Sequence, residues 1–245
     1  MSALTRAMIL AAGLGTRMAP YTAVKPKPLI ELKGKALIDY AIDRLAANGV
    51  KFIVVNVHYK AEMLVAHLEK RSKKDKHVKI EICDEPDAIL DTGGAVAKAL
   101  PDFEGEPFIT HNSDSLWVED IGAALARMKA AWKPDDMDAL MLLATTTRAL
   151  GYDGRGDFDM DAFGGLTRRA EMKLAPFVWT GVQIVHPRLF DGAPKGRFSI
   201  NPLWDKAIER GRLRGIRLDG QWIHVGTPEG LEEADAFLSD LVREP

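Results

Sequence analysis

The stretch "LAAGLGTRMAPYTAVKPKPL", from Leu10 to Leu29, concentrates residue types that bind phosphate groups. Glycines such as Gly13 and Gly15 let backbone N–H groups approach phosphate oxygens closely. The Arg17 guanidinium can pair with two oxygens, and Lys27 adds a compact positive charge. The stretch matches neither common phosphate fingerprint, GxGxxG or GxxxxGK[ST]. The glycines alone would fit an ordinary turn, but with Arg17 and Lys27 they predict a phosphate site.

Two later stretches also place polar residues where chemistry could occur. In "FITHNSDSLW", Asp114 directly follows an apolar strand, and ligands of open α/β sheets bind beyond the carboxyl ends of strands. Asp114 is therefore placed where it could contact a ligand, or it could cap the next helix. In "LDTGGAVAKAL", the residues alone favour an ordinary helix start, with Thr92 as its cap and the glycines allowing close packing.

The elements that must position these residues alternate between apolar strands and helical patterns over the first 145 residues. We expect strands at 6–12, 51–57, 78–83, 107–112 and 138–145, and helices at 35–49, 61–71, 93–100 and 121–132. Prolines flank Lys25 and Lys27, so both lysines should lie on an extended segment. Strand–helix alternation with continuously apolar strands predicts a parallel sheet covered by helices on both faces.

The pattern changes after Leu150. "GDFDMDAFGGLTRR" predicts a hairpin that turns at Gly164–Gly165, and residues 177–187 form a longer strand. Helices follow at 203–211 and 228–242. No linker rich in Pro, Gly or Ser interrupts the chain, so we expect one domain over residues 1–245 with an antiparallel insertion.

Composition limits the classes of partner. The 245 residues are 47% hydrophobic and 28% charged with a net charge of −2, so no general attraction to nucleic acid or to an anionic membrane is expected. The one cysteine, Cys83, excludes an internal disulfide and fits a reducing compartment. We therefore expect a cytoplasmic protein.

The opening stretch resembles the signature of the sugar-nucleotide pyrophosphorylases, the sugar-1-phosphate nucleotidyltransferases, which is roughly AAGxGTRxxPxT followed by PKPL. Further stretches resemble family segments in the same order, so that the likeness runs from Arg6 to about Ala236: "LDTGGAVAKAL", "FITHNSDSLW", "FVWTGVQIVHPRLF" and "WIHVGTPEGLEEA". The resemblance implies a Rossmann-like mixed, mainly parallel sheet flanked by helices, with an antiparallel sugar-binding insertion. It divides the chain into a nucleotide-binding part, 1–150, and a sugar-binding part with the C-terminal helix, 151–245.

The resemblance also implies an activity and a set of site residues. A nucleoside triphosphate and a sugar 1-phosphate would be the substrates, with pyrophosphate as the leaving group. The catalytic residues would be Arg17, Lys27 and Asp114, and Asp114 would hold Mg²⁺. His224 would either be a second metal ligand or bind a phosphate group while Asp114 and the substrates hold the ion. The nucleotide would contact Leu10, Ala11, Ala12, Gly13, Gly15, Thr16, Arg17, Glu85, Thr92 and Gly93; the sugar phosphate would contact Asn112, Asp157, Thr180, Gly181 and Asn201.

Two departures from the family pattern narrow the substrate. His224 stands where the family commonly has a second metal-binding aspartate, and no Glu-Lys-Pro sequence occurs, which leaves Asp157 as the polar candidate toward the sugar. These features are most similar to the short bacterial uridylyltransferases that act on N-acetylmuramate 1-phosphate in peptidoglycan recycling. GTP with mannose 1-phosphate, dTTP or UTP with glucose 1-phosphate, and a non-catalytic nucleotide-binding regulator stay open. We expect a monomer or a small homo-oligomer.

Overall fold

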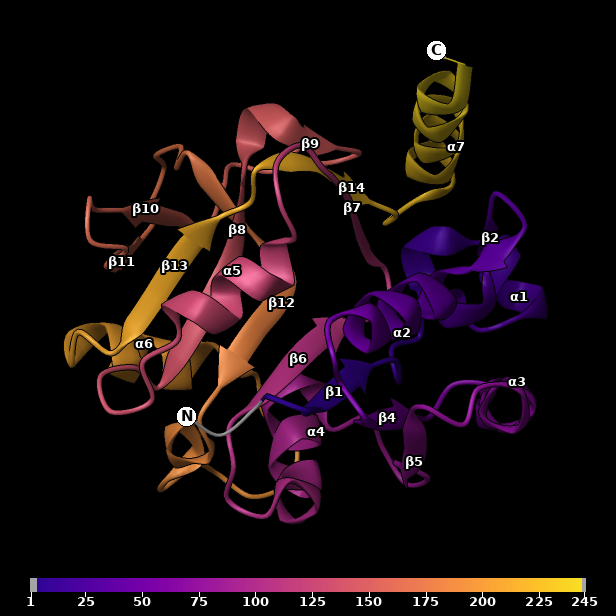
Figure 1. The fold of residues 1–245 in the computed structure, drawn as a ribbon, viewed down its shortest axis with the longest axis horizontal. Helices are drawn as coiled ribbons and strands as arrows, with labels where there is room; N and C mark the ends of the chain where they lie inside the picture. The colour runs from indigo at the N-terminus through magenta and orange to yellow at the C-terminus, as the bar shows by residue number, and fades with distance from the viewer. Residues whose placement is uncertain (1–3, 244–245) are drawn as a thin grey trace.

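A nine-stranded mixed sheet forms the centre of the molecule in the computed structural model, which describes residues 4–243 (Figure 1). Its main path runs β11-β10-β12-β6-β1-β4-β5, and β8 pairs with β12 and with β13. The pairs of β1 with β4 and β6, of β4 with β5 and of β8 with β13 are parallel, and β12 runs antiparallel to its neighbours. The strands are β1 (Arg6–Leu10), β4 (Phe52–Val57), β5 (Lys79–Asp84), β6 (Phe108–Asn112), β8 (Ala139–Thr145), β10 (Phe158–Met160), β11 (Leu166–Arg168), β12 (Phe177–Val185) and β13 (Leu213–Arg217).

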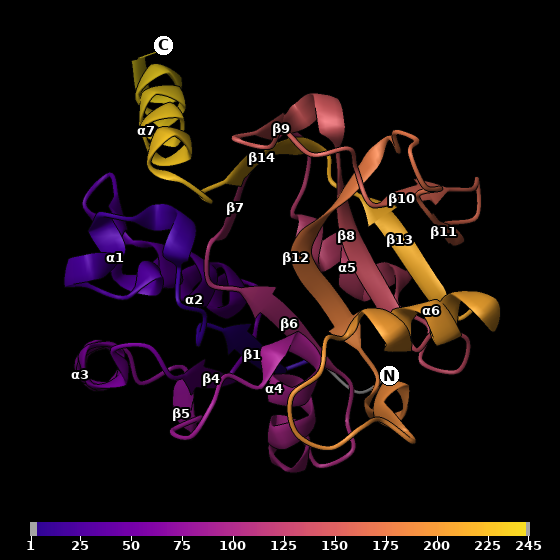
Figure 2. The same cartoon turned by 180° about the vertical axis from the view of Figure 1, so that it is seen from behind.

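Helices cover both faces of this sheet because its central strands are apolar on both sides. In β1, Ala7 and Ile9 face one core while Met8 faces the other. The helices on the first face are α2 (Leu37–Ala47), α3 (Ala61–Lys74) and α5 (Ala124–Ala131). The helices on the second face are α4 (Asp91–Ala99) and α6 (Asn201–Glu209), which Figure 2 shows in front of the sheet.

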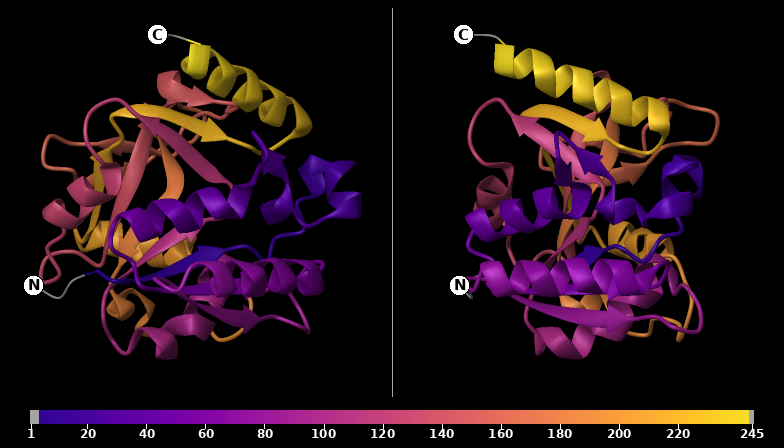
Figure 3. Two further views of the ribbon diagram at one scale, coloured as in Figure 1. Left: turned by 45° about the vertical axis from the view of Figure 1, so that its right-hand side comes forward. Right: turned by 90° about the vertical axis from the view of Figure 1, so that its right-hand side faces the viewer.

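A smaller, three-stranded sheet lies above the large sheet in the view of Figure 1 and joins distant parts of the sequence. It has the order β7-β14-β9, from β7 (Ser115–Glu119), β14 (Gly220–His224) and β9 (Ala149–Leu150). In this sheet His224 lies opposite Ser115, the residue after Asp114. The C-terminal helix α7 (Pro228–Arg243) follows β14 and packs at the outer side of this sheet (Figure 3). Leu37, Leu116 and Ile223 belong to the third core, which lies below α7.

Short elements shape the chain between β1 and α2. They are η1 (Thr16–Met18), α1 (Tyr21–Val24), η2 (Lys27–Leu29) and the two-stranded pair β2 (Glu31–Leu32) with β3 (Lys35–Ala36). The remaining 3-10 turns are η3 (Leu100–Phe103), η4 (Thr146–Arg148) and η5 (Pro187–Phe190).

The expected strands and helices are all present, but several bounds and strands differ. The helix expected from residue 35 begins at Leu37, because Lys35 and Ala36 pair with β2 instead. The hairpin near Gly164 is confirmed, with Gly164 at a φ of 80°. The strands β7, β13 and β14 were not expected. None of the helices within residues 4–243 has the length and apolar character needed to cross a membrane.

The expectation for Lys27 is wrong. Lys25 is extended as expected, but Lys27 begins the 3-10 turn η2. Pro28 is compatible with this turn because the first residues of a helical turn need no donated N–H. The turn brings the Lys27 side chain back toward the loop after β1.

Candidate active site

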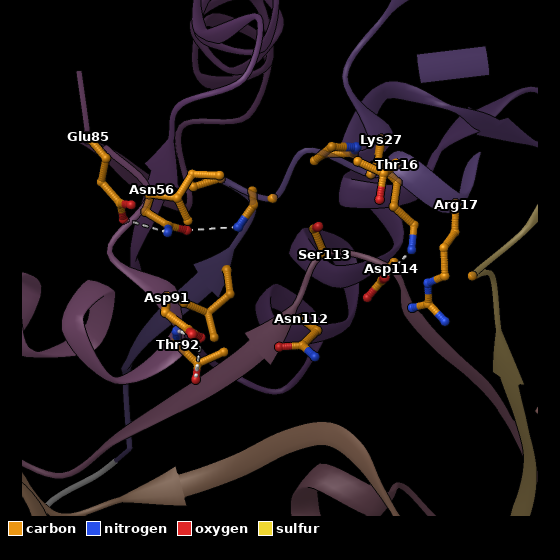
Figure 4. Close-up of a pocket in the computed structure, with 18 of the residues that line it drawn as sticks. Thr16, Arg17, Lys27, Asn56, Glu85, Asp91, Thr92, Asn112, Ser113 and Asp114 are labelled. Atoms are coloured by element: carbon orange, nitrogen blue, oxygen red, sulfur yellow. Dashed lines mark hydrogen bonds and ion pairs between the residues drawn. The ribbon is translucent and has the colours of Figure 1, made fainter. Parts of the chain in front are cut away.

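Two adjoining cavities lie at the carboxyl ends of β1 and β6. The first, of about 380 Å³, holds most of the residues expected to bind nucleotide (Figure 4). The second, of about 350 Å³, holds most of those expected to bind the sugar phosphate. Arg17, Asn112 and Asp114 line both. The first cavity is lined by Leu10, Ala11, Ala12, Gly13, Gly15, Thr16, Arg17, Lys27, Pro28, Asn56, Glu85, Ile89, Asp91, Thr92, Asn112, Ser113, Asp114, Arg197 and Gly226.

Gly15 is the residue that lets the loop after β1 turn against Lys27. Its φ of 63° is left-handed, and a Cβ there would lie 2.9 Å from the Thr22 methyl and 3.0 Å from the Lys27 Cβ. The Thr22 hydroxyl donates to the Gly15 carbonyl at 3.1 Å, which fixes the turn. Gly13 has open space around its Cα, as expected for a backbone that must leave room for a ligand.

Lys27 and Asp114 form an ion pair across the cavity. The Lys27 ammonium donates to Asp114 Oδ2, and both side chains are largely shielded, with 12% and 24% of their surfaces exposed. Burial acts to raise the pKa of Asp114, but the charge and hydrogen bond of Lys27 outweigh it, so that the pKa lies below its usual value. Asp114 is therefore an anion at neutral pH.

Two arginines at the site have no partner within the described residues. Arg17 and Arg197 are exposed, line the first cavity, and donate no side-chain hydrogen bond to another described residue. Figure 4 shows Arg17 at the same end of the cavity as Lys27 and Asp114. Because a guanidinium offers a planar fork of donors, both arginines are free to bind phosphate or carboxylate oxygens.

The other end of the first cavity carries two carboxylates, an amide and a hydroxyl. Glu85, Asn56, Asp91 and Thr92 lie together there, on the far side of Ser113 from Lys27 (Figure 4). Glu85 and Asn56 are buried, with 2% and 3% of their surfaces exposed. This end has no lysine or arginine paired with Glu85 among the described residues, so its polar character differs from that of the Lys27 end.

Packing explains the glycines of α4. The N–H groups of Gly93 and Gly94 both donate to the Phe198 carbonyl at 3.0 Å. A Cβ on Gly93 would meet the Phe198 ring at 2.4 Å, and one on Gly94 would meet the Gly196 carbonyl at 2.2 Å. Gly93 does not line the cavity, whereas Thr92 does and accepts from the Ile200 N–H at 3.1 Å. The glycines thus hold the segment 196–200 against the cavity wall.

The second cavity has an aromatic wall and one available carboxylate. Tyr152, Trp179 and Trp222 line it together with Asp157. Asp157 Oδ2 accepts from the Trp179 N–H at 2.9 Å, while Oδ1 has no described partner. Aromatic faces and a carboxylate suit the apolar faces and hydroxyl groups of a sugar.

Most of the other residues expected to contact the sugar phosphate line the second cavity, but Asn201 does not. Thr180 and Gly181 line the second cavity, but the Thr180 hydroxyl already donates to the Leu142 carbonyl at 2.9 Å. Gly181 has a φ of 87° and lies against Asn112, since a Cβ there would be 2.7 Å from Asn112 Nδ2. Asn201 lines neither cavity; it is exposed and accepts from Arg168 at 3.0 Å.

His224 and Asp114 are the protein groups that could hold a metal ion. The His224 ring lies over Gly226, where a Cβ would be 2.4 Å from Nε2. Burial lowers the pKa of His224; Asp114 acts to raise it, while Lys27 and Arg17 lower it further, so the ring is neutral at pH 7. Within residues 4–243, no three or more His, Cys, Asp and Glu side chains are grouped so that they could hold a metal ion. Any ion here would need substrate oxygens or water to complete its shell.

Asn56 and Arg197 line the first cavity although the sequence did not single them out. Asn56 carried a signal, because it is a polar residue inside the apolar run "FIVVNV". Arg197 carried none, because the loop that contains it is far from the signature in sequence. A further cavity of about 570 Å³ lies at the opposite edge of the sheet, beside Lys129, Trp132 and His186, and contains none of the expected site residues.

Sequence comparison finds relatives along nearly the whole chain. The pattern of the Nucleotidyl transferase family matches residues 6–153. An N-acetylmuramate alpha-1-phosphate uridylyltransferase of Caulobacter vibrioides is 43% identical over 234 residues, which is 96% of this chain and 97% of the relative. A protein of the same name from Neisseria meningitidis serogroup B is 33% identical, over 95% of this chain and 97% of its own length.

Solved structures with a similar fold include enzymes whose names mention different nucleotides. A UDP-glucose pyrophosphorylase complexed with UDP-glucose has a TM-score of 0.77 and 17% identity, over 97% of this chain and 99% of its own. The inositol-1-phosphate CTP transferase of T. maritima has a TM-score of 0.77 and 18% identity, over 99% and 98%. At this identity the likeness shows the nucleotide-diphospho-sugar transferase fold.

Proposed function

The chain belongs to the Nucleotidyl transferase family and is a sugar-1-phosphate nucleotidyltransferase, and on that premise we propose that it joins UTP to N-acetylmuramate 1-phosphate. The products are the UDP-sugar and pyrophosphate, a step of peptidoglycan recycling. The observation that carries the proposal is the joined pair of cavities. At their junction lie the Lys27–Asp114 pair and Arg17, whose side chain bonds to none of residues 4–243. The two relatives that bear this activity in their names support the choice of substrate.

The chemistry needs charge stabilisation and alignment more than proton transfer. An oxygen of the sugar 1-phosphate attacks the α-phosphorus of the nucleotide, and the bond from that phosphorus to the bridging oxygen breaks to release pyrophosphate. The attacking oxygen is already anionic, so no general base is required. Arg17 and the backbone around Gly13 and Gly15 bind the phosphates, and Lys27 offsets the negative charge that gathers at the α-phosphorus.

We assign the metal requirement to Mg²⁺ held by Asp114, with His224 as a neighbouring polar group. Asp114 supplies a hard carboxylate oxygen and is already ionised, which fits magnesium. When bound, Mg²⁺ would supply positive charge to the phosphate oxygens at the reacting centre. His224 offers imidazole nitrogen, which suits softer transition metals better.

The two parts of the chain bind different substrates, one in each cavity. Residues 1–150 supply the nucleotide side through Glu85 and Thr92, and residues 151–245 supply the sugar side through Asp157 and Gly181. We propose that the whole chain acts as one domain, because β13 and β14 from the second part pair with β8 and β7 from the first. The free Cys83 fits a cytoplasmic location, and the chemistry requires no partner chain beyond a monomer or small homo-oligomer.

A matrix of turnover measurements tests the proposal. Pyrophosphate release is measured with UTP, GTP, dTTP and CTP against the 1-phosphates of N-acetylmuramate, N-acetylglucosamine, glucose and mannose. The highest kcat/KM is expected for UTP with N-acetylmuramate 1-phosphate. A higher value for GTP with mannose 1-phosphate would replace the substrate assignment, and no turnover with any pair would leave a nucleotide-binding regulator.

A further inference from the structure

Asn56 occupies a central position at the carboxyl edge of the sheet. It lies near the end of β4, between Leu10 of β1 and Cys83 of β5, and 3% of its surface is exposed. A polar side chain that is this buried needs hydrogen-bond partners. Its amide has two: Oδ1 accepts the Ala11 N–H at 2.7 Å, and Nδ2 donates to Glu85 Oε1 at 2.8 Å. Both bonds are drawn in Figure 4.

These bonds fix which way the amide faces. A backbone N–H can only donate, so the atom that faces Ala11 must be the amide oxygen, and the NH₂ group must face Glu85. The second carboxylate oxygen of Glu85, Oε2, accepts the Leu90 N–H at 2.9 Å. Both oxygens of Glu85 are therefore approached by N–H donors, and the carboxylate faces the cavity as an acceptor of hydrogen bonds.

The backbone of Glu85 is held independently of Asn56. Its N–H donates to the Val57 carbonyl at 2.9 Å, and its carbonyl accepts from His58 Nδ1 at 2.6 Å. Loss of the Asn56 amide would leave Glu85 at the same place in the chain, with its carboxylate held only by the Leu90 N–H through Oε2. The carboxylate could then rotate about that one remaining bond. The orientation of the carboxylate, rather than the position of the residue, depends on Asn56.

An oriented acceptor at the base end of a nucleotide cavity discriminates between nucleobases. Uracil presents a ring N–H at position 3, which can donate to a carboxylate. Cytosine has almost the same shape but presents a lone pair at that nitrogen, which a carboxylate repels. A site built to pair with an N–H group therefore rejects the analogue that lacks it, because two acceptors then face each other without a proton between them.

We infer that Asn56 is a positioning residue that sets nucleotide specificity: its amide joins the phosphate-binding loop at Ala11 to Glu85 and holds the Glu85 carboxylate toward a nucleobase that carries a ring N–H. The inference rests on the proposed function for the identity of the ligand as a nucleoside triphosphate. It extends that function by assigning the preference for UTP over CTP to a residue that need not touch the base.

The experiment compares the affinities for UTP and CTP, measured by titration calorimetry with Mg²⁺ and without sugar phosphate. The wild type is expected to bind UTP more tightly than CTP. In Asn56→Leu the ratio of the two dissociation constants is expected to fall by about tenfold or more. Asn56→Asp keeps an acceptor for Ala11 but sets a carboxylate against Glu85, so it should also lose selectivity. Retained selectivity in Asn56→Asp would show that Ala11, and not Glu85, is what Asn56 serves.

Val54→Ala is the matched control. Val54 is fully buried, belongs to the same strand, and lies on the same face as Asn56, but it bonds to neither Ala11 nor Glu85. It should lower stability without changing the UTP-to-CTP ratio. An equal change of the ratio in Val54→Ala, or no change in a folded Asn56→Leu, would overturn the inference.

A double-mutant cycle with Glu85→Gln completes the test. If Asn56 acts through Glu85, the double variant Asn56→Leu/Glu85→Gln should be no less selective than Glu85→Gln alone. Additive losses would mean that Asn56 acts by another route and would overturn the inference. Because binding needs no turnover, absence of product with every sugar phosphate would remove the proposed function while leaving this result in place.

Discussion

The ammonium of Lys27 and the carboxylate of Asp114 meet at the junction of the two cavities, although 87 residues separate them in the chain. Each neutralises the other before substrate arrives. When the substrates and the metal ion bind, the Lys27 ammonium can turn to the phosphates and the Asp114 carboxylate to the metal ion. Neither group is then left without a neighbour of opposite charge, so the exchange costs little free energy. The ion pair therefore keeps a cation and an anion at the position where the phosphate groups and the metal ion are expected to bind.

Lys27→Ala should lower kcat about a hundredfold or more, because one oriented charge at the transition state contributes ~3 kcal/mol. The measurement is steady-state pyrophosphate release. Lys25→Ala is the control from the same motif, since Lys25 pairs with Glu31 at the surface and lines neither cavity. Equal activity of the two folded variants would refute the role of Lys27.

Arg17→Lys should raise KM for the nucleotide and for pyrophosphate in the reverse reaction, because an ammonium cannot reproduce the guanidinium fork. Arg210→Lys serves as the control, since Arg210 is exposed directly after α6 and lines neither cavity. Unchanged constants for both ligands in Arg17→Lys would count against phosphate binding by Arg17.

Gly15→Ala should impair catalysis as well as stability. Its left-handed backbone costs a Cβ-bearing residue about 1 kcal/mol, and the new methyl would press on Lys27 at 3.0 Å. Gly34→Ala shares the left-handed φ, at 74°, but has nothing within 4 Å. Thermal unfolding should show a loss of stability in both variants, larger in Gly15→Ala because of the added contact, while kcat should fall only in Gly15→Ala. A similar kcat in both would mean that Gly15 does not position Lys27.

The sequence predicted the alternation of strands and helices because continuous apolar runs such as "FIVVNV" have only one stable place in a covered parallel sheet. It did not predict β7 and β14, because these strands depend on each other: Trp117 opposes Trp222, and neither segment is apolar enough to stand out alone. The phosphate-binding loop could be predicted from the sequence because its glycines, Arg17 and Lys27 lie within one short stretch. Arg197 was not, because its place depends on the packing of Phe198 against Gly93.

His111 should make the stability fall in mild acid. Its ring is fully buried behind the site, and burial lowers its pKa from 6.5 to about 4. Above pH 6.5 the ring is neutral in both folded and unfolded chains, so the full stability is present. As the pH falls toward 4, the unfolded chain binds a proton that the folded chain refuses, and the free energy of unfolding drops by about 3 kcal/mol.

Urea unfolding of the wild type and of His111→Asn between pH 7 and pH 4 measures this contribution. The variant has its own stability at pH 7, but its free energy of unfolding should decline less steeply with acid, by one bound proton over the window. The comparison removes the contributions of the carboxylates, which both chains share. Identical slopes for the two proteins would show that His111 is protonated in the folded state.

His224 should bind a phosphate group rather than the metal ion. It lies beside Asp114, Lys27 and Arg17 as a neutral ring, and the site has no third protein ligand among residues 4–243. A neutral imidazole can donate to a phosphate oxygen, whereas magnesium prefers carboxylate, phosphate and water oxygens. His224→Asn should therefore stay active with a raised KM for the sugar phosphate. His224→Asp adds a hard anionic oxygen and should lower the Mg²⁺ concentration needed for half-maximal activity.

Titrations of wild type, His224→Asn and His224→Asp with Mg²⁺, Mn²⁺ and Co²⁺ separate the two roles of His224. Complete loss of activity in His224→Asn, together with a wild-type preference for Mn²⁺ or Co²⁺ over Mg²⁺, would make the histidine a metal ligand.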